Sequence, residues 1–183
     1  MKRLVAIATA ALLAGCATGG QAPAETIRST VSISGTDGAA TRTLESYSNV
    51  GGSTHRISAT PDKVWAVLPN VYQGLGITVG TSLPDYMTIG NSKLELNRTL
   101  GGQPLSSFVS CGYGPNGAPL ADSYRVNMAV VTTVAPAAGG AAEVETRVQA
   151  SATNRAVSGA SVNCATTGRL EGMIAERVKN QAM

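Results

Sequence analysis

The stretch that decides the fold is residues 123–153, SYRVNMAVVTTVAPAAGGAAEVETRVQASAT. Apolar and polar residues alternate on both sides of a small, glycine-containing segment, APAAGGAA. Such alternation is typical of strands that bury one face, and the segment between them suits a hairpin loop. We therefore predict a long antiparallel hairpin with one apolar face. The residues expected on that face are Tyr124, Val126, Met128, Val130, Val134, Val144, Val148, Ala150 and Ala152.

Two helices are expected to cover this face. Residues 60–76, TPDKVWAVLPNVYQGLG, begin with a suitable N-cap residue, Thr60, and carry Pro61 at the first helical position. Apolar residues follow at helical spacing, and Pro69 interrupts the donors, so we expect a kink or a break there. A second amphipathic helix is predicted near the C-terminus. Its apolar face consists of Leu170, Met173, Ile174 and Val178.

The order of these elements predicts an α+β fold. We expect an antiparallel sheet with a kinked N-terminal helix and a C-terminal amphipathic helix packed on one face. Residues 51–183 are long enough for a single domain of this kind. The preceding residues 26–50 are polar and rich in Ser and Thr, and they favour a strand hairpin or an extension.

The N-terminus carries the features of an export signal. Lys2 and Arg3 precede a short apolar run, which lacks the roughly 20 residues that a membrane-spanning helix needs. The run ends in Leu13-Ala14-Gly15-Cys16, which resembles the lipobox of bacterial lipoproteins. The resemblance implies a cleaved signal peptide at 1–15, a diacylglyceryl group on Cys16 and a membrane anchor at that residue. Ala17 after the cysteine implies, under the enteric sorting rule, the outer membrane, with the domain in the periplasm or at the cell surface.

Residues 16–25, with the lipidated cysteine at their start, then form a flexible tether. Cleavage also changes the charge of the chain. The full sequence has 14 basic and 11 acidic residues and a net charge of +3. Loss of Lys2 and Arg3 leaves 12 basic residues against 11 acidic ones. Because the remaining arginines are scattered singly, we expect no nucleic-acid partner.

The two cysteines outside the lipobox are Cys111 and Cys164. An even pair in an oxidising compartment favours a disulfide. A reactive thiol would require the sole histidine, His55, beside it in space. A zinc site normally takes three or four ligands, and we expect no metal site here.

One stretch resembles a nucleotide-binding loop. Gly112, Gly114 and Gly117 have the spacing G-x-G-x-x-G. That fingerprint requires a following helix that points its N-terminus at phosphate, whereas Pro115 and the segment after Gly117 favour a turn. Since no catalytic cluster of side chains can be recognised elsewhere, we expect no enzymatic activity and no cofactor.

The segment ISATPDKVWAVL, residues 57–68, resembles the opening of helix-grip domains. In the START or Bet v 1-like group, a strand and helix carry the pattern that Ile57, Ala59, Val64, Trp65 and Leu68 show here. The BamC-type accessory lipoproteins of outer-membrane barrel assembly also have helix-grip domains behind a lipobox. The chain departs from both, because it has fewer strands than the first and room for only one such domain.

These observations lead to two hypotheses of function. The first is a non-enzymatic cell-envelope lipoprotein, tethered to the outer membrane, whose domain serves as a scaffold and binds an envelope protein partner. The second is a carrier or sensor of an apolar ligand, which a helix-grip resemblance implies between the sheet and the last helix. The residues expected to line that cavity are Val126, Met128, Val130, Val148, Met173 and Ile174.

Overall fold

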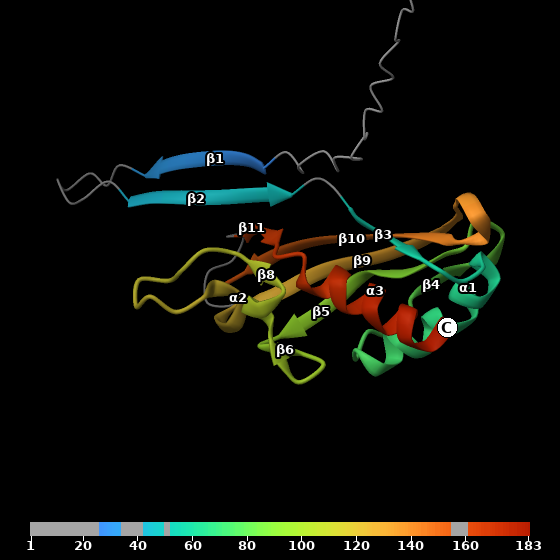
Figure 1. Cartoon of the computed structure of the whole chain (residues 1–183). Helices are drawn as coiled ribbons and strands as arrows, with labels where there is room; N and C mark the ends of the chain where they lie inside the picture. The colour runs from blue at the N-terminus through green and yellow to red at the C-terminus, as the bar shows by residue number, and fades with distance from the viewer. Residues whose placement is uncertain (1–25, 34–41, 50–51, 155–160) are drawn as a thin grey trace, which may run out of the picture.

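A computed structural model of the protein describes the backbone of residues 26–33 and 42–49, and backbone and side chains of residues 52–154 and 161–183. The predicted fold class is confirmed: the chain is α+β, with an open antiparallel sheet and helices on one face (Figure 1). The signal segment 1–15 and the tether 16–25, including Cys16, lie outside the described residues.

The main sheet has seven strands in the order β4-β5-β9-β10-β11-β8, and β3 pairs with β10 beside β11. β4 therefore lies at one margin of the sheet, and β8 lies at the other. The strands are β3 (Ser53–Ile57), β4 (Thr81–Leu83), β5 (Thr88–Asn97), β8 (Val109–Ser110), β9 (Arg125–Pro136), β10 (Ala142–Thr153) and β11 (Ser161–Thr166).

The predicted hairpin forms the centre of this sheet. β9 and β10 pair without a register shift, from Arg125 opposite Thr153 to Pro136 opposite Ala142. The strands alternate between buried and more exposed residues, as the sequence pattern predicts. The connecting turn η3 (Ala138–Gly140) contains Gly139 at φ 74°, a conformation that glycine adopts without strain.

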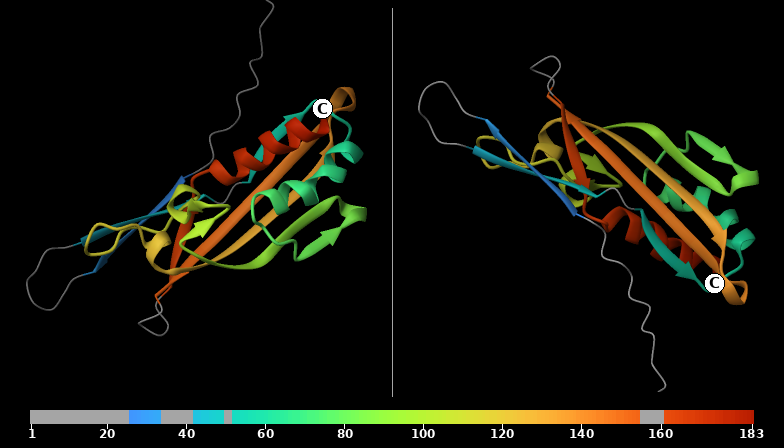
Figure 2. Two further views of the ribbon diagram at one scale, coloured as in Figure 1. Left: turned by 90° about the horizontal axis from the view of Figure 1, so that it is seen from below. Right: turned by 90° about the horizontal axis from the view of Figure 1, so that it is seen from above.

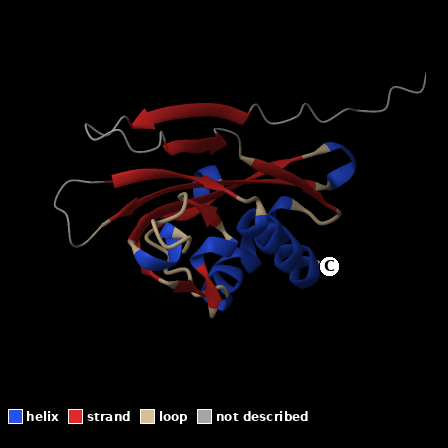
Figure 3. Cartoon of the chain, turned by 90° about the vertical axis from the view of Figure 1, so that its left-hand side faces the viewer, coloured by secondary structure: helices blue, strands red, loops and turns tan. Residues whose placement is uncertain are grey.

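Helices α1 (Pro61–Gly74) and α3 (Arg169–Ala182) cover one face of the sheet, as Figures 2 and 3 show. Their apolar stripes are buried, with Val64, Leu68, Val71, Leu170, Ile174 and Val178 at most 0 % exposed. Burying such stripes against a sheet is the main source of stability for short helices.

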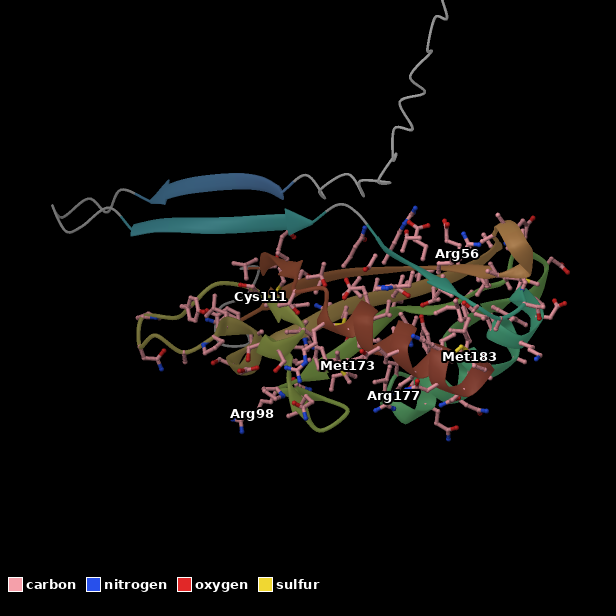
Figure 4. All side chains as sticks on the ribbon, viewed as in Figure 1. Arg56, Arg98, Cys111, Met173, Arg177 and Met183 are labelled. Carbon is pink, nitrogen blue, oxygen red and sulfur yellow. A yellow bond between two sulfur atoms is a disulfide. The ribbon has the colours of Figure 1, made fainter. Side chains whose placement is uncertain are left out.

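Two details of the helices differ from expectation. α1 continues through Pro69 to Gly74, so the helix does not break there. Thr60 occupies the N-cap position, but its side chain makes no capping hydrogen bond. At the other end of α1, Arg177 of α3 donates a 2.8 Å hydrogen bond to the carbonyl of Gly74 (Figure 4). This bond supplies a donor and a cation to the C-terminus of α1.

The remaining elements are small. β1 (Thr26–Ile33) and β2 (Arg42–Asn49) form a separate antiparallel hairpin, and β2 lies near β11 on the side of the sheet away from the helices (Figures 1 and 2). β6 (Thr99–Leu100) pairs with β7 (Gln103–Pro104). The turns η1 (Pro84–Tyr86) and η2 (Leu105–Ser107) and the short helix α2 (Leu120–Ser123) complete the described elements.

Candidate functional site

The six residues proposed for a ligand cavity lie on the inner face of β9 and β10 and on α3. Five of them are buried in the main hydrophobic cluster, and Met173 is partly buried against it. Side chains in mutual contact of this kind form a packed core. An apolar ligand would therefore have to take the place of these side chains. The five buried residues are Val126, Met128, Val130, Val148 and Ile174.

A disulfide joins Cys111 to Cys164. It connects the segment after β8 with β11, at the end of the sheet where Figure 4 marks Cys111. Cys111 is buried, and β8 pairs with the end of β11 directly beside the bridge. Thr167 adds hydrogen bonds from its hydroxyl to the carbonyls of Ser107 and Phe108, at 2.8 and 3.1 Å. Because both sulfur atoms are bonded to each other, neither serves as a nucleophile or a metal ligand.

The glycine motif forms a compact turn beside the bridge. The backbone amide of Gly114 donates to the carbonyl of Ala118 at 2.8 Å, and that of Leu120 donates to Gly112 at 2.9 Å. Gly112 and Gly117 have φ of 85° and 76°, so both positions favour glycine for conformational reasons. The helix that follows has only four residues. The glycines therefore have a structural explanation in the turn itself.

The titratable side chains outside the core are engaged locally. His55 lies 3.0 Å from the hydroxyl of Ser53 on the same strand. Asp122 accepts hydrogen bonds from the amide and the hydroxyl of Ser106, at 2.8 and 2.6 Å, and so joins α2 to η2. Within the part of the chain that the structure describes, no three His, Cys, Asp or Glu residues gather in a way that could hold a metal ion.

One acidic side chain is buried. Glu171, in the first turn of α3, is 1 % exposed. Its Oε1 accepts a 2.6 Å hydrogen bond from Thr166, and its Oε2 has no hydrogen-bond partner. The hydroxyl of Thr166 also accepts from the amide of Gly168 at 3.1 Å, which ties the carboxylate to the N-terminus of the helix. A helix N-terminus stabilises negative charge, so this position suits the carboxylate.

Three hydroxyl groups form a hydrogen-bonded chain in the core. The phenolic oxygen of Tyr72 on α1 lies 2.9 Å from the hydroxyl of Thr132 on β9, which lies 2.9 Å from that of Thr146 on β10. The Tyr72 hydroxyl also donates to the carbonyl of Ile89 at 3.3 Å. Burial raises the pKa of Tyr72 to about 12, although the bond with Thr132 acts in the opposite direction. The chain satisfies these polar groups and fixes α1 over the sheet.

The exposed hydrophobic side chains are unevenly distributed. Five large ones are exposed in the described part of the chain, and three of them lie within eight residues, around β4 and η1. Val79 is 37 % exposed, Leu83 is 45 % and Tyr86 is 74 %. We call these three residues the β4–η1 patch. Scattered apolar residues are normal on a protein surface, whereas a cluster indicates an interaction site.

The backbone at the end of the patch is held in an unusual conformation. Met87, directly after Tyr86, has φ and ψ of 43°, in the left-handed region. For a residue other than glycine, this region costs about 1–2 kcal/mol. Two hydrogen bonds maintain it: the Met87 amide donates to Pro84 at 3.0 Å, and its carbonyl accepts from Val134 at 3.0 Å. The turn therefore holds Tyr86 outward, and strain of this kind occurs preferentially at functional sites.

A pocket of about 410 Å³ adjoins the patch. It lies between the C-terminal half of α1 and the segment that leads into β4, and Val79 belongs to both the pocket and the patch. More of its exposed lining is apolar than polar, and its volume suits a single large side chain. Its lining residues are Pro69, Gln73, Gly76, Ile77, Thr78 and Val79.

A second hollow, of about 310 Å³, lies on the sheet face away from the helices. Ser151 on β10 lies between Asn127 on β9 and Asn163 on β11 in the paired register, and these three residues form much of its lining. An uncharged polar surface of this kind is what an antiparallel sheet presents to water. The β4–η1 patch is therefore the stronger candidate for a functional site.

The sequence pattern did not reveal this patch. Leu83-Pro84-Asp85 indicates a turn, and turns lie at the surface, so exposure of Tyr86 was within reach of prediction. The neighbouring pocket could not be predicted, because it depends on where α1 ends relative to β4.

The comparisons with known proteins identify no relatives: no protein-family model and no curated protein matches the chain. None of the described helices has both the length and the apolar character needed to cross a membrane.

Proposed function

We propose that this chain is a non-enzymatic lipoprotein of the bacterial cell envelope, anchored by lipid at Cys16, whose domain binds a protein partner through the β4–η1 patch. The clustering of Val79, Leu83 and Tyr86 at the margin of the sheet carries the proposal. Aromatic side chains at a surface, next to a pocket, are typical anchors of protein interfaces.

Further observations support the envelope location. The lipobox residues Leu13 to Cys16 supply the anchor, and the disulfide between Cys111 and Cys164 suits an oxidising compartment. Two or three acyl chains on one cysteine give durable attachment, which a single chain does not. The outer membrane is the proposed destination, with the domain in the periplasm or at the cell surface.

The carrier hypothesis ranks second. Its six residues pack against the main hydrophobic cluster, so it requires the core to open around a ligand. The β4–η1 patch requires no such rearrangement, because its side chains are already at the surface.

Site-specific photo-crosslinking tests the proposed interaction in the full-length chain. A photo-reactive amino acid replaces Tyr86 in one variant and Tyr113 in the control, in an enteric bacterial host with an intact envelope. Tyr113 is a suitable control because it is 68 % exposed and lies near the disulfide, away from β4.

We expect one discrete protein adduct from position 86 and a much weaker one from position 113. The adduct should disappear when Leu83→Ser is added to the Tyr86 variant, because that change removes a neighbouring apolar contact. Equal labelling from both positions, or no adduct from position 86, would contradict the proposal.

A further inference from the structure

The strand β4 leaves one side of its backbone unpaired. It is the last strand of the sheet order, and Thr81, Ser82 and Leu83 are all exposed. Its pairs with β5 are antiparallel, with Ser82 opposite Ile89. Because hydrogen bonds alternate along an antiparallel ladder, part of the β4 backbone points away from β5 and can pair with another strand.

The β4 edge lacks the charged side chains that normally prevent pairing between sheets. Edge strands are commonly protected by lysine or other charges, whereas Thr81, Ser82 and Leu83 are all uncharged. The strand is short, and Pro84 follows it directly. These features limit pairing to a few residues without preventing it.

The two ends of β4 complement each other. The pocket lined by Thr78 and Val79 lies before the strand, and Tyr86, with 74 % of its surface exposed, lies after it. One chain thus carries both a hollow and a side chain of suitable size for it, on opposite sides of Ser82. A surface of this kind is self-complementary under a two-fold rotation.

We propose that two copies of this chain pair β4 with β4 about a two-fold axis at Ser82, so that Tyr86 of each copy reaches the pocket of the other. This inference rests on the proposed function of the β4–η1 patch and names its occupant, a second copy of the chain. In this register Ser82 faces Ser82 of the second copy, Leu83 faces Thr81, and the turn with Tyr86 comes to lie toward residues 78–80.

The charges around the strand are compatible with this arrangement. Asp85 is the acidic residue of η1. Two-fold pairing about Ser82 directs it toward Val79 of the second copy and away from the second Asp85. Because each copy uses its only β4 edge, the assembly closes as a dimer and cannot extend into a fibre.

The dimer is expected to be weak in solution. Three-residue strands and one aromatic side chain from each copy bury less than the roughly 1,200 Å² that stable interfaces need. Attachment of both copies to one membrane, as the proposed function requires, raises their effective concentration and favours pairing.

Cysteine crosslinking at the axis tests this register in the full-length, membrane-attached chain. Residues directly opposite in an antiparallel pair have Cα atoms about 4.5–5.5 Å apart, within the range that a disulfide bridges. The Ser82→Cys variant should therefore form a covalent dimer in an oxidising envelope. Ser92→Cys, an exposed position on β5, is the matched control for random collision.

We expect at least about tenfold more covalent dimer from Ser82→Cys than from Ser92→Cys. Adding Tyr86→Ser to Ser82→Cys should reduce the dimer several-fold, because the pocket loses its occupant. Sedimentation of the unmodified chain in detergent should show a dimer that grows with concentration, and this measurement does not depend on the folding of any variant.

The outcomes separate this inference from the proposed function. If Ser82→Cys gives no more dimer than Ser92→Cys and the unmodified chain sediments as a monomer, two-fold pairing is wrong. A Tyr86 photo-adduct whose mass identifies a different protein would then leave the partner-binding function standing with another occupant. If the photo-adduct is missing as well, both proposals fail.

Discussion

The phenolic oxygen of Tyr72 lies 2.9 Å from the hydroxyl oxygen of Thr132, and this contact joins α1 to the central strand of the sheet. Thr132 is 0 % exposed and also contacts Thr146 across the β9–β10 pair. The polar chain therefore connects three elements inside an otherwise apolar core. Buried groups of this kind stabilise a fold when every member has a partner.

The raised pKa of Tyr72 predicts a loss of stability in alkaline solution. In the unfolded chain the phenol titrates near its ordinary pKa of 10, whereas in the fold its pKa is about 12. The folded state therefore keeps a proton that the unfolded state loses. The free energy of unfolding should fall by up to about 3 kcal/mol as the pH rises from 10 through 12.

Urea unfolding at several pH values measures this effect, with Tyr72→Phe as the control. The variant lacks the ionisable group, so the difference between the two proteins should shrink above pH 10. At neutral pH the variant should be less stable by about 1 kcal/mol, because one hydrogen bond is lost. Parallel pH profiles for the two proteins would contradict the assignment.

Removal of the disulfide should destabilise the domain without changing its fold. The bridge joins residues that are 53 positions apart. The chain-entropy model assigns about 4 kcal/mol to a loop of this length, which corresponds to roughly 10 °C in the melting temperature. Thermal unfolding with and without reductant measures the loss.

A Cys111→Ala, Cys164→Ala variant serves as the control for reduction. It should melt at the temperature of the reduced protein and should not respond to reductant. An unchanged melting temperature after complete reduction would show that the bridge contributes nothing to stability.

Two glycines should respond in opposite directions to substitution by alanine. A Cβ at Gly90 on β5 would overlap the carbonyl oxygen of Val130 and lie 2.9 Å from the Cα of Val131. Gly90→Ala should therefore cost about 2 kcal/mol or more. Gly172, inside α3, has nothing within 4 Å of the same position, and Gly172→Ala should stabilise by about 0.5–1 kcal/mol.

Chemical denaturation of the two variants checks this pair. The comparison is sharp because the substitution is identical and only the surroundings differ. Equal effects at the two positions would mean that the close approach of β5 to β9 at Gly90 is wrong.

Substitution at the β4–η1 patch should leave the fold intact. Tyr86 is largely exposed, so Tyr86→Ser should change the free energy of unfolding by no more than about 0.5 kcal/mol. Phe108, at 1 % exposure, gives the contrasting case, and Phe108→Ala should cost about 3–5 kcal/mol. A large loss of stability in Tyr86→Ser would indicate that this side chain serves the core and not a partner.

Several elements of the fold follow from local patterns. The alternation in β9 and β10 and the apolar spacing in α1 and α3 are properties of neighbouring residues, and the sequence is sufficient to predict them. The course of α1 through Pro69 was harder to predict. Packing of Leu68 and Val71 on the sheet stabilises the helix on both sides of the proline, and the pattern alone cannot weigh that contribution.

The candidate site depends on non-local relationships. The pocket beside Val79 requires the end of α1 to lie next to the segment before β4, and the burial of Glu171 requires β11 to end beside α3. Neither relationship produces a periodic pattern in the sequence. For the same reason, the alternation does not show that Thr132 and Thr146 share hydrogen bonds with Tyr72.

The lipoprotein proposal is tested most directly by the intact mass of the full-length chain, extracted from membranes and measured under native conditions. The proposal predicts a protein that begins at Cys16, carries acyl chains there, lacks two hydrogens because of the Cys111–Cys164 bridge and retains no further small molecule. A chain that keeps residues 1–15 without lipid would contradict the anchor. A stoichiometric apolar adduct within the domain would contradict the interaction function and favour a ligand carrier.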